Sequence, residues 1–428
     1  MKPEQSSNNK QSGLRFILRS FHYRNYRLFF SGQCISLIGT WIQNIAMSWL
    51  VYRLTGSALM LGLVGFAGNV PTFLISPFAG VLVDRGNRHR ILLITQALAM
   101  LQAFILALLV LTDNILVWHI IPLSIFLGLV NALDAPARQA FVTEIVEDRN
   151  DLGNAIALNS SMFNGARLIG PSVAGVLIAA MGEGLCFLIN GISYLAVLAA
   201  LLAMRVKPRK TEGAKDNIFK HFKDGLAYVR GFAPIRYILM LLALVSFTGM
   251  PYTVLMPVFA SEILHGGPHT LGFMMGASGM GALTGAVYLA SRKNIRGLEK
   301  NIPFAAGLFG TGLIFFSQSR SFLFSLCLLL FTGFGMMVQM ASCNTVVQTI
   351  VDDDKRGRVM SLYAAAFMGV VPFGSLFAGT MASWLGAPNT VLIGGIASVG
   401  GALLFSSGLP ALRKIILPIY DEKLRSQE

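Results

Sequence analysis

Charged residues are scarce in this sequence: only 13% of its 428 residues are Asp, Glu, Lys or Arg, while 54% are hydrophobic. An ordinary soluble domain carries about 25% charged residues. The mean hydropathy of +0.64 is also too high for a chain that hides its apolar residues in one core. The composition therefore excludes a soluble globular domain and predicts a polytopic membrane protein.

Several kinds of chemical site are also missing. The four cysteines fall inside apolar runs without the paired spacing of a metal site, so we interpret them as packing residues. The sequence has no phosphate-binding loop and no Ser/His/Asp set, and its six histidines fall at span borders or in loops. We therefore expect no enzyme, no cofactor, no metal site and no direct use of ATP.

Long apolar runs fill almost the whole chain. A segment of about 20 apolar residues is long enough to cross the hydrocarbon layer of a bilayer. We predict twelve such spans and hence an all-α membrane protein, at residues 26–51, 58–83, 91–111, 115–136, 154–180, 184–204, 236–262, 270–291, 302–318, 322–348, 360–384 and 388–408.

The basic residues are sorted by side of the membrane. The net charge of +14 could suggest nucleic acid, but all but three of the 34 Lys and Arg residues fall in the termini and in alternate loops. The exceptions are Arg53, Arg167 and Arg320. Under the positive-inside rule this predicts a multi-pass protein of a bacterial inner membrane with both termini in the cytoplasm, and no nucleic-acid partner.

The chain divides into two similar parts. Residues 1–204 hold six spans after an amphipathic segment at residues 14–22, residues 205–235 form a polar linker with a short amphipathic helix, and residues 236–428 hold six spans and a tail. Ala174-Gly175 in the first part matches Ala378-Gly379 in the second at an offset of 204. Such internal repeats are typical of secondary transporters, whose substrate binds between the repeats. We expect a monomer.

The stretch "GVLVDRGNRHR", residues 80–90, resembles the loop between the second and third helices of the major facilitator superfamily. The resemblance implies the twelve-helix fold of that superfamily, in two six-helix halves, and a loop that holds the cytoplasmic side shut through Asp84, Arg85 and Arg88. In the family, the arginine lies near an acid on the fourth helix, and Asp134 ends the predicted fourth span here. The alternative partner of Asp134 is Arg138, one helical turn away.

A second stretch, "ARLIGPSVAG", resembles the fifth-helix signature of antiporters in the same superfamily. Its small residues let a neighbouring helix approach, and Pro171, after Gly170, bends the helix where it must change shape. The longer run from Leu133 to Gly175 resembles the branch of enterobactin-type siderophore exporters and related drug exporters. This resemblance implies export of a small organic molecule.

Polar residues inside the spans are candidates for a substrate cavity. The first span has a stripe at Gln33, Ser36, Thr40, Asn44 and Ser48, which share one helical face. A single residue of this kind is more often interhelical glue, worth about 0.6 kcal/mol, whereas the whole stripe favours cavity lining. The candidate cavity residues are Gln33, Thr40, Asn44, Asn164, Arg167, Thr253 and Gln339.

Arg167 is the most costly of these candidates, because an arginine at the centre of a span costs about 2.5 to 3.5 kcal/mol on insertion. In one interpretation its guanidinium binds anionic or carbonyl oxygens of the cargo. In the other it caps backbone carbonyls and holds the first half together. A cationic cavity without acids favours neutral or anionic cargo, such as a siderophore.

No Asp or Glu falls in the middle of a predicted span, although proton coupling usually needs an intramembrane titratable group. Asp134, near the cytoplasmic border, is the best candidate if H⁺ is the coupling ion. The sequence thus predicts a secondary transporter that exports a small molecule by alternating access. The alternatives are a metabolite importer of the same fold and a non-transporting membrane receptor.

Overall fold

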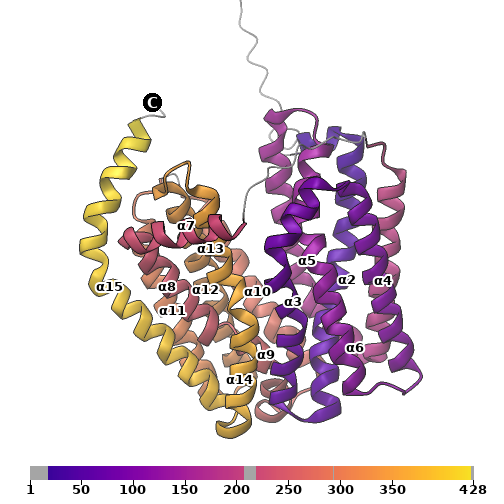
Figure 1. Ribbon diagram of the computed structural model, residues 1–428. Helices are drawn as coiled ribbons and strands as arrows, with labels where there is room; N and C mark the ends of the chain where they lie inside the picture. Colours follow the sequence, from indigo (N-terminus) through magenta and orange to yellow (C-terminus); the bar gives the residue numbers. More distant parts are fainter. Residues whose placement is uncertain (1–17, 207–217, 293, 426–428) are drawn as a thin grey trace, which may run out of the picture.

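The computed structural model describes residues 18–206, 218–292 and 294–425, and these are almost entirely helical (Figure 1). The first half contains η1 (Arg19–His22), α2 (Arg24–Thr55), α3 (Ala58–Arg85), α4 (Arg88–Leu111), α5 (Val117–Ile145) and α6 (Arg149–Ala203). The second contains α7 (Ile218–Gly231), α8 (Ala233–Thr248), α9 (Tyr252–Val258), η2 (Phe259–Ile263), α10 (Pro268–Ala290), α11 (Leu298–Gln318), α12 (Phe322–Ile350), α13 (Arg356–Ala364), η3 (Ala365–Gly369), α14 (Val371–Leu385) and α15 (Ala387–Arg425).

Ten helical segments of the described residues are long and apolar enough to cross a membrane. One of them, α6, has 55 residues and is interrupted at Gly182, whose φ of 78° is not helical, so that it covers two of the predicted spans. Another predicted span, 302–318, is occupied by α11, which is not one of the ten. The arrangement is all-helical and compatible with twelve crossings.

The helix that holds the fourth predicted span is longer than that span. This span was expected to finish at residue 136, but α5 continues to Ile145 and has Pro136 in its interior. Asp134 therefore lies 11 residues before the end of α5, which is about 16 Å of helix, and not at its border. The last helix also exceeds its prediction, because α15 continues as far as Arg425.

The linker and the N-terminal segment are partly described. The predicted amphipathic helix of the linker is α7, which Figure 1 shows lying across the helices of the second bundle. Of the predicted N-terminal amphipathic segment, residues 14–17 lie outside the described residues. Its end forms η1, where the Ser20 hydroxyl donates a 2.7 Å hydrogen bond to Asn154 Oδ1 of α6.

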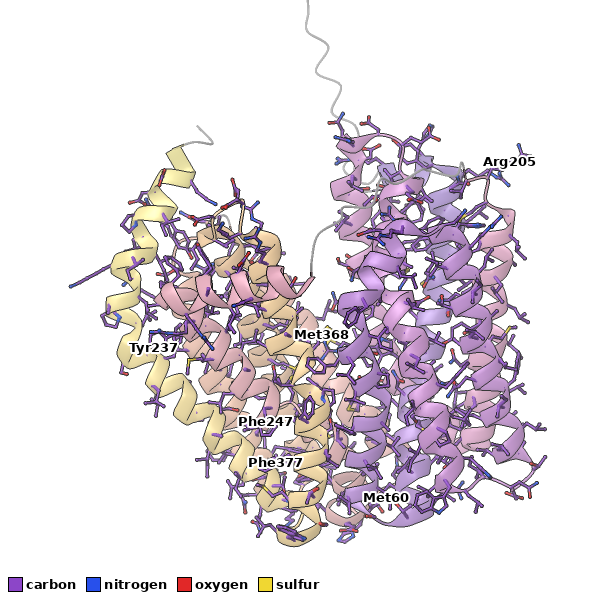
Figure 2. The ribbon with its side chains drawn as sticks, in the orientation of Figure 1. Met60, Arg205, Tyr237, Phe247, Met368 and Phe377 are labelled. Atoms are coloured by element: carbon purple, nitrogen blue, oxygen red, sulfur yellow. The ribbon has the colours of Figure 1, made fainter. Side chains whose placement is uncertain are left out.

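The helices form two bundles, which have opposite ends that we name by the chain. The end at which α2 begins and α15 finishes is named the termini face. The opposite end, at which α3 and α15 begin, is named the far face. Figure 2 labels Arg205 at the termini face and Met60 at the far face. As drawn in Figure 1, the bundles meet at the far face and diverge toward the termini face.

Glycines allow the two bundles to meet at two helix crossings. A Cβ built on Gly175 of α6 would lie 2.8 Å from the Gly272 Cα of α10, and one built on Gly62 of α3 would lie 2.9 Å from the Gly379 Cα of α14. Both contacts are closer than real Cβ atoms approach. A side chain at these positions would therefore push the halves apart.

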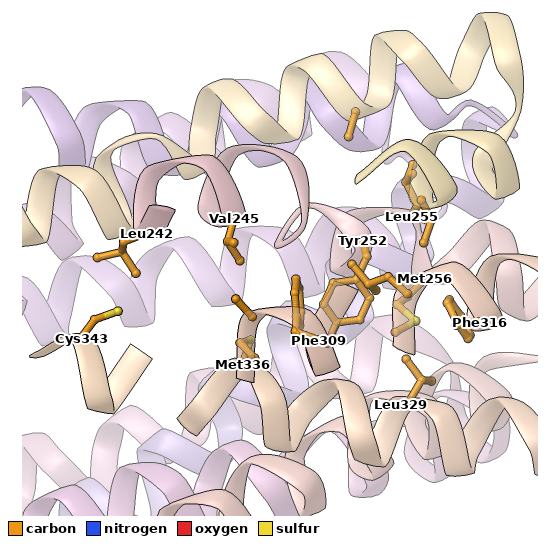
Figure 3. Packing of buried hydrophobic residues seen from close by; sticks show 14 of the residues in the cluster. Leu242, Val245, Tyr252, Leu255, Met256, Phe309, Phe316, Leu329, Met336 and Cys343 are labelled. Atoms are coloured by element: carbon orange, nitrogen blue, oxygen red, sulfur yellow. The ribbon is translucent and has the colours of Figure 1, made fainter. Parts of the chain in front are cut away.

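The second half has a dense aromatic core beside this boundary. Figure 3 shows Tyr252, Phe309, Phe316 and Met336 packed together, and each of them is at most 3% exposed. The rings of Phe316 and Phe259 stack with their centroids 4.6 Å apart. This core fixes α9 and α12, the two helices that face Arg167 of the first half.

Candidate functional site

Arg167 reaches from the first half to the second. Its Nη2 lies 3.9 Å from the Sδ atom of Met336 on α12, and Tyr252 of α9 is close enough for an electrostatic interaction. The residue is half-buried. In the described part of the chain, no carboxylate pairs with Arg167, and its hydrogen bond goes to the opposite half rather than to a backbone carbonyl of its own half. Among the described residues, it is a cation held at the boundary without a counter-charge.

Polar groups of the second half lie near this arginine. The hydroxyls of Tyr252 and Ser278 are 2.7 Å apart and hydrogen-bonded, both in the buried interior. One turn beyond Met336, Gln339 is 2% exposed. Its Nε2 and the Ser342 hydroxyl are buried without a hydrogen-bond partner among the described residues. Buried polar groups normally have partners, so these atoms mark places for a further ligand or water.

The polar stripe of α2 divides into different environments. Gln33 is 1% exposed and its Oε1 accepts from Arg138 Nη1 of α5 at 3.5 Å, inside the first half. Thr40 is half-buried and donates to the Ser36 carbonyl at 2.9 Å. Asn44 is exposed. Part of the stripe therefore acts as glue between helices of one half, and Asn44 is its most exposed member.

Two other candidate cavity residues are half-buried and bonded to their own helices. Asn164 Nδ2 donates to the Ser160 carbonyl at 2.9 Å, and the Thr253 hydroxyl donates to the Met250 carbonyl at 3.1 Å. Neither bond crosses between the halves. Asn164 keeps its Oδ1 and a second N–H, and the Thr253 oxygen can still accept, so both side chains retain hydrogen-bonding capacity for a ligand.

Asp134 has different partners from those expected by analogy with the family. It is 5% exposed, and its Oδ1 accepts hydrogen bonds from Thr95 at 2.9 Å and from Gln96 at 2.8 Å, both on α4. Its Oδ2 lies 3.5 Å from Arg138 Nη2, one turn along α5. The expected pairing with Arg85 or Arg88 is absent from the described residues because Asp134 lies too far along α5 from the loop.

The acid that meets the loop is Glu144. Arg88 pairs with Glu144 of α5 at 2.8 Å and with Asp84 of α3 at 3.0 Å. The side chains of Arg88 and Glu144 are only 12% and 13% exposed, whereas Asp84 is 62% exposed. Arg85 is exposed. Arg88 thus pairs with an acid of the expected helix, but that acid is Glu144 and not the predicted Asp134.

Gly170 and Pro171 act at helix contacts. A Cβ on Gly170 would lie 2.4 Å from the Trp41 Cβ, so that glycine is needed where α6 packs on α2. The carbonyl of Pro171 lies against Gly272 at the α6–α10 crossing. The helix remains continuous through Pro171, and its break is at Gly182.

Two polar contacts at the far face were not expected from the sequence. The Tyr52 hydroxyl at the end of α2 donates to the Glu262 carboxylate in η2 of the opposite half. The next residue, Arg53, pairs with Glu183 at 2.7 Å, just after the break in α6. The far face is thus held by a bond between the halves and by an ion pair within the first half.

Comparison with known proteins gives the family. A family model described as transmembrane secretion effector matches residues 18–419. The chain is 28% identical to the staphyloferrin A transporter of Staphylococcus aureus, over 89% of this chain and 95% of the relative. It is 26% identical to the multidrug efflux pump Tap of Mycolicibacterium fortuitum over 83% and 88%, and 22% identical to macrolide efflux protein A of Streptococcus pyogenes over 87% and 94%.

Solved transporter structures share the fold. A POT family transporter in complex with 5-aminolevulinic acid superposes with a TM-score of 0.72 at 11% identity, covering 91% of this chain and 97% of the other. A mutant of the nucleoside transporter NupG gives a TM-score of 0.70 at 12% identity, covering 90% and 99%. At these identities the likeness concerns the fold alone.

Proposed function

Because the chain belongs to the transmembrane secretion effectors of the major facilitator superfamily, we propose that it exports a small organic molecule by alternating access. The relatives support this direction, since two of the three named above are efflux proteins. The staphyloferrin A transporter supports a siderophore as one class of cargo. The cargo path follows the boundary between the halves, where repeats of secondary transporters bind their substrates.

The observation that carries the cargo class is Arg167, a guanidinium at the boundary without a carboxylate partner in the described residues. A fixed fork of donors suits carboxylate and carbonyl oxygens. The unpartnered Nε2 of Gln339 adds a further donor on the opposite half. A boundary with such donors selects neutral or anionic cargo over lipophilic cations.

The termini face is proposed to be cytoplasmic, because the Lys and Arg residues gather there. With that orientation, the glycine crossings and the bond between Tyr52 and Glu262 close the extracellular side. Cargo would enter from the cytoplasm of a bacterial cell and leave through the inner membrane. Asp84 and Arg85 are exposed at the cytoplasmic end and are proposed to meet the second half when that end closes.

Asp134 is proposed as the proton site if transport is driven by H⁺. It is buried between α4 and α5, next to a single cation among the described residues. Buried ionisable groups inside a bundle are typical of proton relays. The transporter is proposed to act as a monomer, since one chain holds both halves of the boundary.

Transport into everted membrane vesicles tests the proposal. Vesicles that contain the chain should accumulate more staphyloferrin A than vesicles without it. The same vesicles should accumulate staphyloferrin A to a higher level than a macrolide. A matched preparation of Arg167→Met should lose this accumulation. Accumulation only in right-side-out vesicles would make the protein an importer, and binding without movement in either orientation would make it a receptor.

A further inference from the structure

A cavity of about 340 Å³ lies at the termini face of the second half, away from the proposed cargo path. It is formed by the end of α12, the start of α13, the end of α15 and the loop before α11. Its lining consists of Ile295, Thr345, Gln348, Thr349, Arg356, Tyr420 and Lys423. Apart from Ile295, every lining side chain carries a hydrogen-bonding group, and two of them are cations.

The two cations converge on one point. Arg356 Nη2 pairs with Asp353 Oδ1, and Lys423 Nζ lies 3.8 Å from the same oxygen. The Asp353 side chain is 80% exposed, so it can turn away into solvent. The exposed Asp353 carboxylate therefore lies between two cations from different helices. An anion that carries more charge than a carboxylate could replace it at this position.

The next acid along the chain, Asp354, is paired with a lysine outside the cavity lining. Lys355 Nζ lies 2.7 Å from Asp354 Oδ2. Its hydrogen bond lowers the pKa of the Asp354 carboxyl, which therefore stays charged and paired with Lys355. Asp353 is the acid that competes for the two lining cations.

Tyr420 supplies a buried donor without a partner. The residue is 2% exposed, and its hydroxyl has no hydrogen-bond partner among the described residues. A buried hydroxyl normally has such a partner, and its free energy is lowered when it gains one. Tyr420 lines the cavity, so a small movement of its side chain would let a ligand oxygen provide that partner.

We propose that this cavity binds a phosphate group, held by Arg356, Lys423 and the Tyr420 hydroxyl in place of Asp353. Guanidinium and ammonium groups bind phosphate by charge-assisted hydrogen bonds. The phosphate belongs either to the headgroup of an anionic lipid, which basic segments near the inner leaflet attract, or to a soluble phosphate compound. The bound phosphate would link α12, α13 and α15 at the termini face.

Ligand binding can be measured on the purified full-length chain. Thermal unfolding is followed while inorganic phosphate is added at constant ionic strength, and separately in nanodiscs of phosphatidylglycerol or phosphatidylcholine. We expect a saturable rise in the unfolding temperature. A rise with inorganic phosphate identifies a soluble ligand, and a rise confined to phosphatidylglycerol identifies a lipid headgroup.

The variants have opposite expected signs. Tyr420→Phe and Lys423→Gln should weaken binding about tenfold, whereas Asp353→Asn should tighten it because the competing carboxylate is lost. Lys414→Gln, on the same helix outside the cavity, and Asp354→Asn are the controls and should leave affinity unchanged. No saturable response to either ligand, an equal loss in Lys414→Gln, or weaker binding in Asp353→Asn would overturn the proposal.

Discussion

The hydroxyl of Tyr52 donates a hydrogen bond to the carboxylate of Glu262 and so joins α2 of the first half to η2 of the second. Tyr52 is 7% exposed. The contact lies at the far face, on the same side as the crossings of Gly175 with Gly272 and Gly62 with Gly379. Any movement that opens the far face must break this bond, which makes it a point where that movement can be measured.

Tyr52→Phe should shift the population toward an open far face. A hydrogen bond to a charged group contributes about 1.5 to 3 kcal/mol, so the open state should gain about tenfold or more. The measurement is labelling of Ser172→Cys, which packs against Gly276 at the crossing, by an impermeant maleimide in a chain without its native cysteines. Tyr26→Phe is the control, because the Tyr26 hydroxyl bonds to Ala155 within one half. Equal labelling in the two variants would contradict this role of Tyr52.

Substitution at a crossing should act in the same direction by a different cause. In Gly175→Ala, the added Cβ would meet the Gly272 Cα and the Pro268 carbonyl, each 2.8 Å away. Overpacking of this kind costs about 1 to 3 kcal/mol in the closed state alone. Faster labelling of Ser172→Cys is expected. Gly165→Ala, with open space around its Cβ position, should behave as the unsubstituted chain; if both variants label alike, the crossing does not limit opening.

Arg167→Met and Arg167→Lys separate a role in binding from a role in folding. Because Arg167 is bonded to Met336, interacts electrostatically with Tyr252 and has no acid as a partner in the described residues, removal of the charge should leave the unfolding temperature close to normal. Cargo binding should fall at least about tenfold in Arg167→Met and partly in Arg167→Lys, which keeps the charge without the fork. Loss of heat stability in both variants with binding intact would instead assign Arg167 to packing.

Asp134→Asn should uncouple transport from a pH gradient if the buried carboxylate carries the proton. Asparagine can still accept from Thr95 and Gln96, whereas Arg138 loses its counter-charge. Removing one partner of a buried pair costs about 3 to 5 kcal/mol, so stability is measured beside transport. Glu144→Gln, which removes a carboxylate of the same helix near the termini face, is the control. Gradient-driven export that survives in folded Asp134→Asn would move the search to Glu262 or to another ion.

A double-mutant cycle on Arg88→Gln and Glu144→Gln should give a coupling energy of about 1 to 3 kcal/mol in thermal unfolding. The reason is that both side chains are largely buried and 2.8 Å apart. The same cycle on Arg88 and Asp84 should give less than about 1 kcal/mol, since Asp84 is exposed to solvent. Equal coupling energies in the two cycles would show that burial does not determine how strongly Arg88 interacts with each acid.

Sequence reasoning found the features that repeat along the chain. Spans follow from apolar length, and the matched small pairs at Gly175 and Gly379 lie at the two glycine crossings between the halves. The sequence could not give the partners of these glycines, because Gly272 and Gly62 are brought to them only by packing. The length and direction of α5 likewise decide that Glu144 is the acid that meets Arg88. The sequence of the loop alone does not specify this geometry.

The polar residues show the same limit. Gln33 and Asn44 share one predicted face, yet one is buried within the first half and the other is exposed. No single neighbouring helix covers the whole length and width of one helical face. Residues with the same spacing can therefore differ in burial. Glu262 and Tyr52 are separated by 210 positions, and nothing in either local stretch marks them as partners.

The two glycine crossings define a line, and a rotation of one half against the other about that line needs no side chain to be displaced at the axis. From Gly62 to Arg85, α3 continues for 23 residues, or about 35 Å of lever arm. Each degree of rotation therefore moves the basic loop by about 0.6 Å, while the backbone at the axis stays within contact distance. A small rotation at the far face is thus amplified into a large displacement at the termini face. It is permitted because none of the four crossing glycines carries a Cβ methyl group.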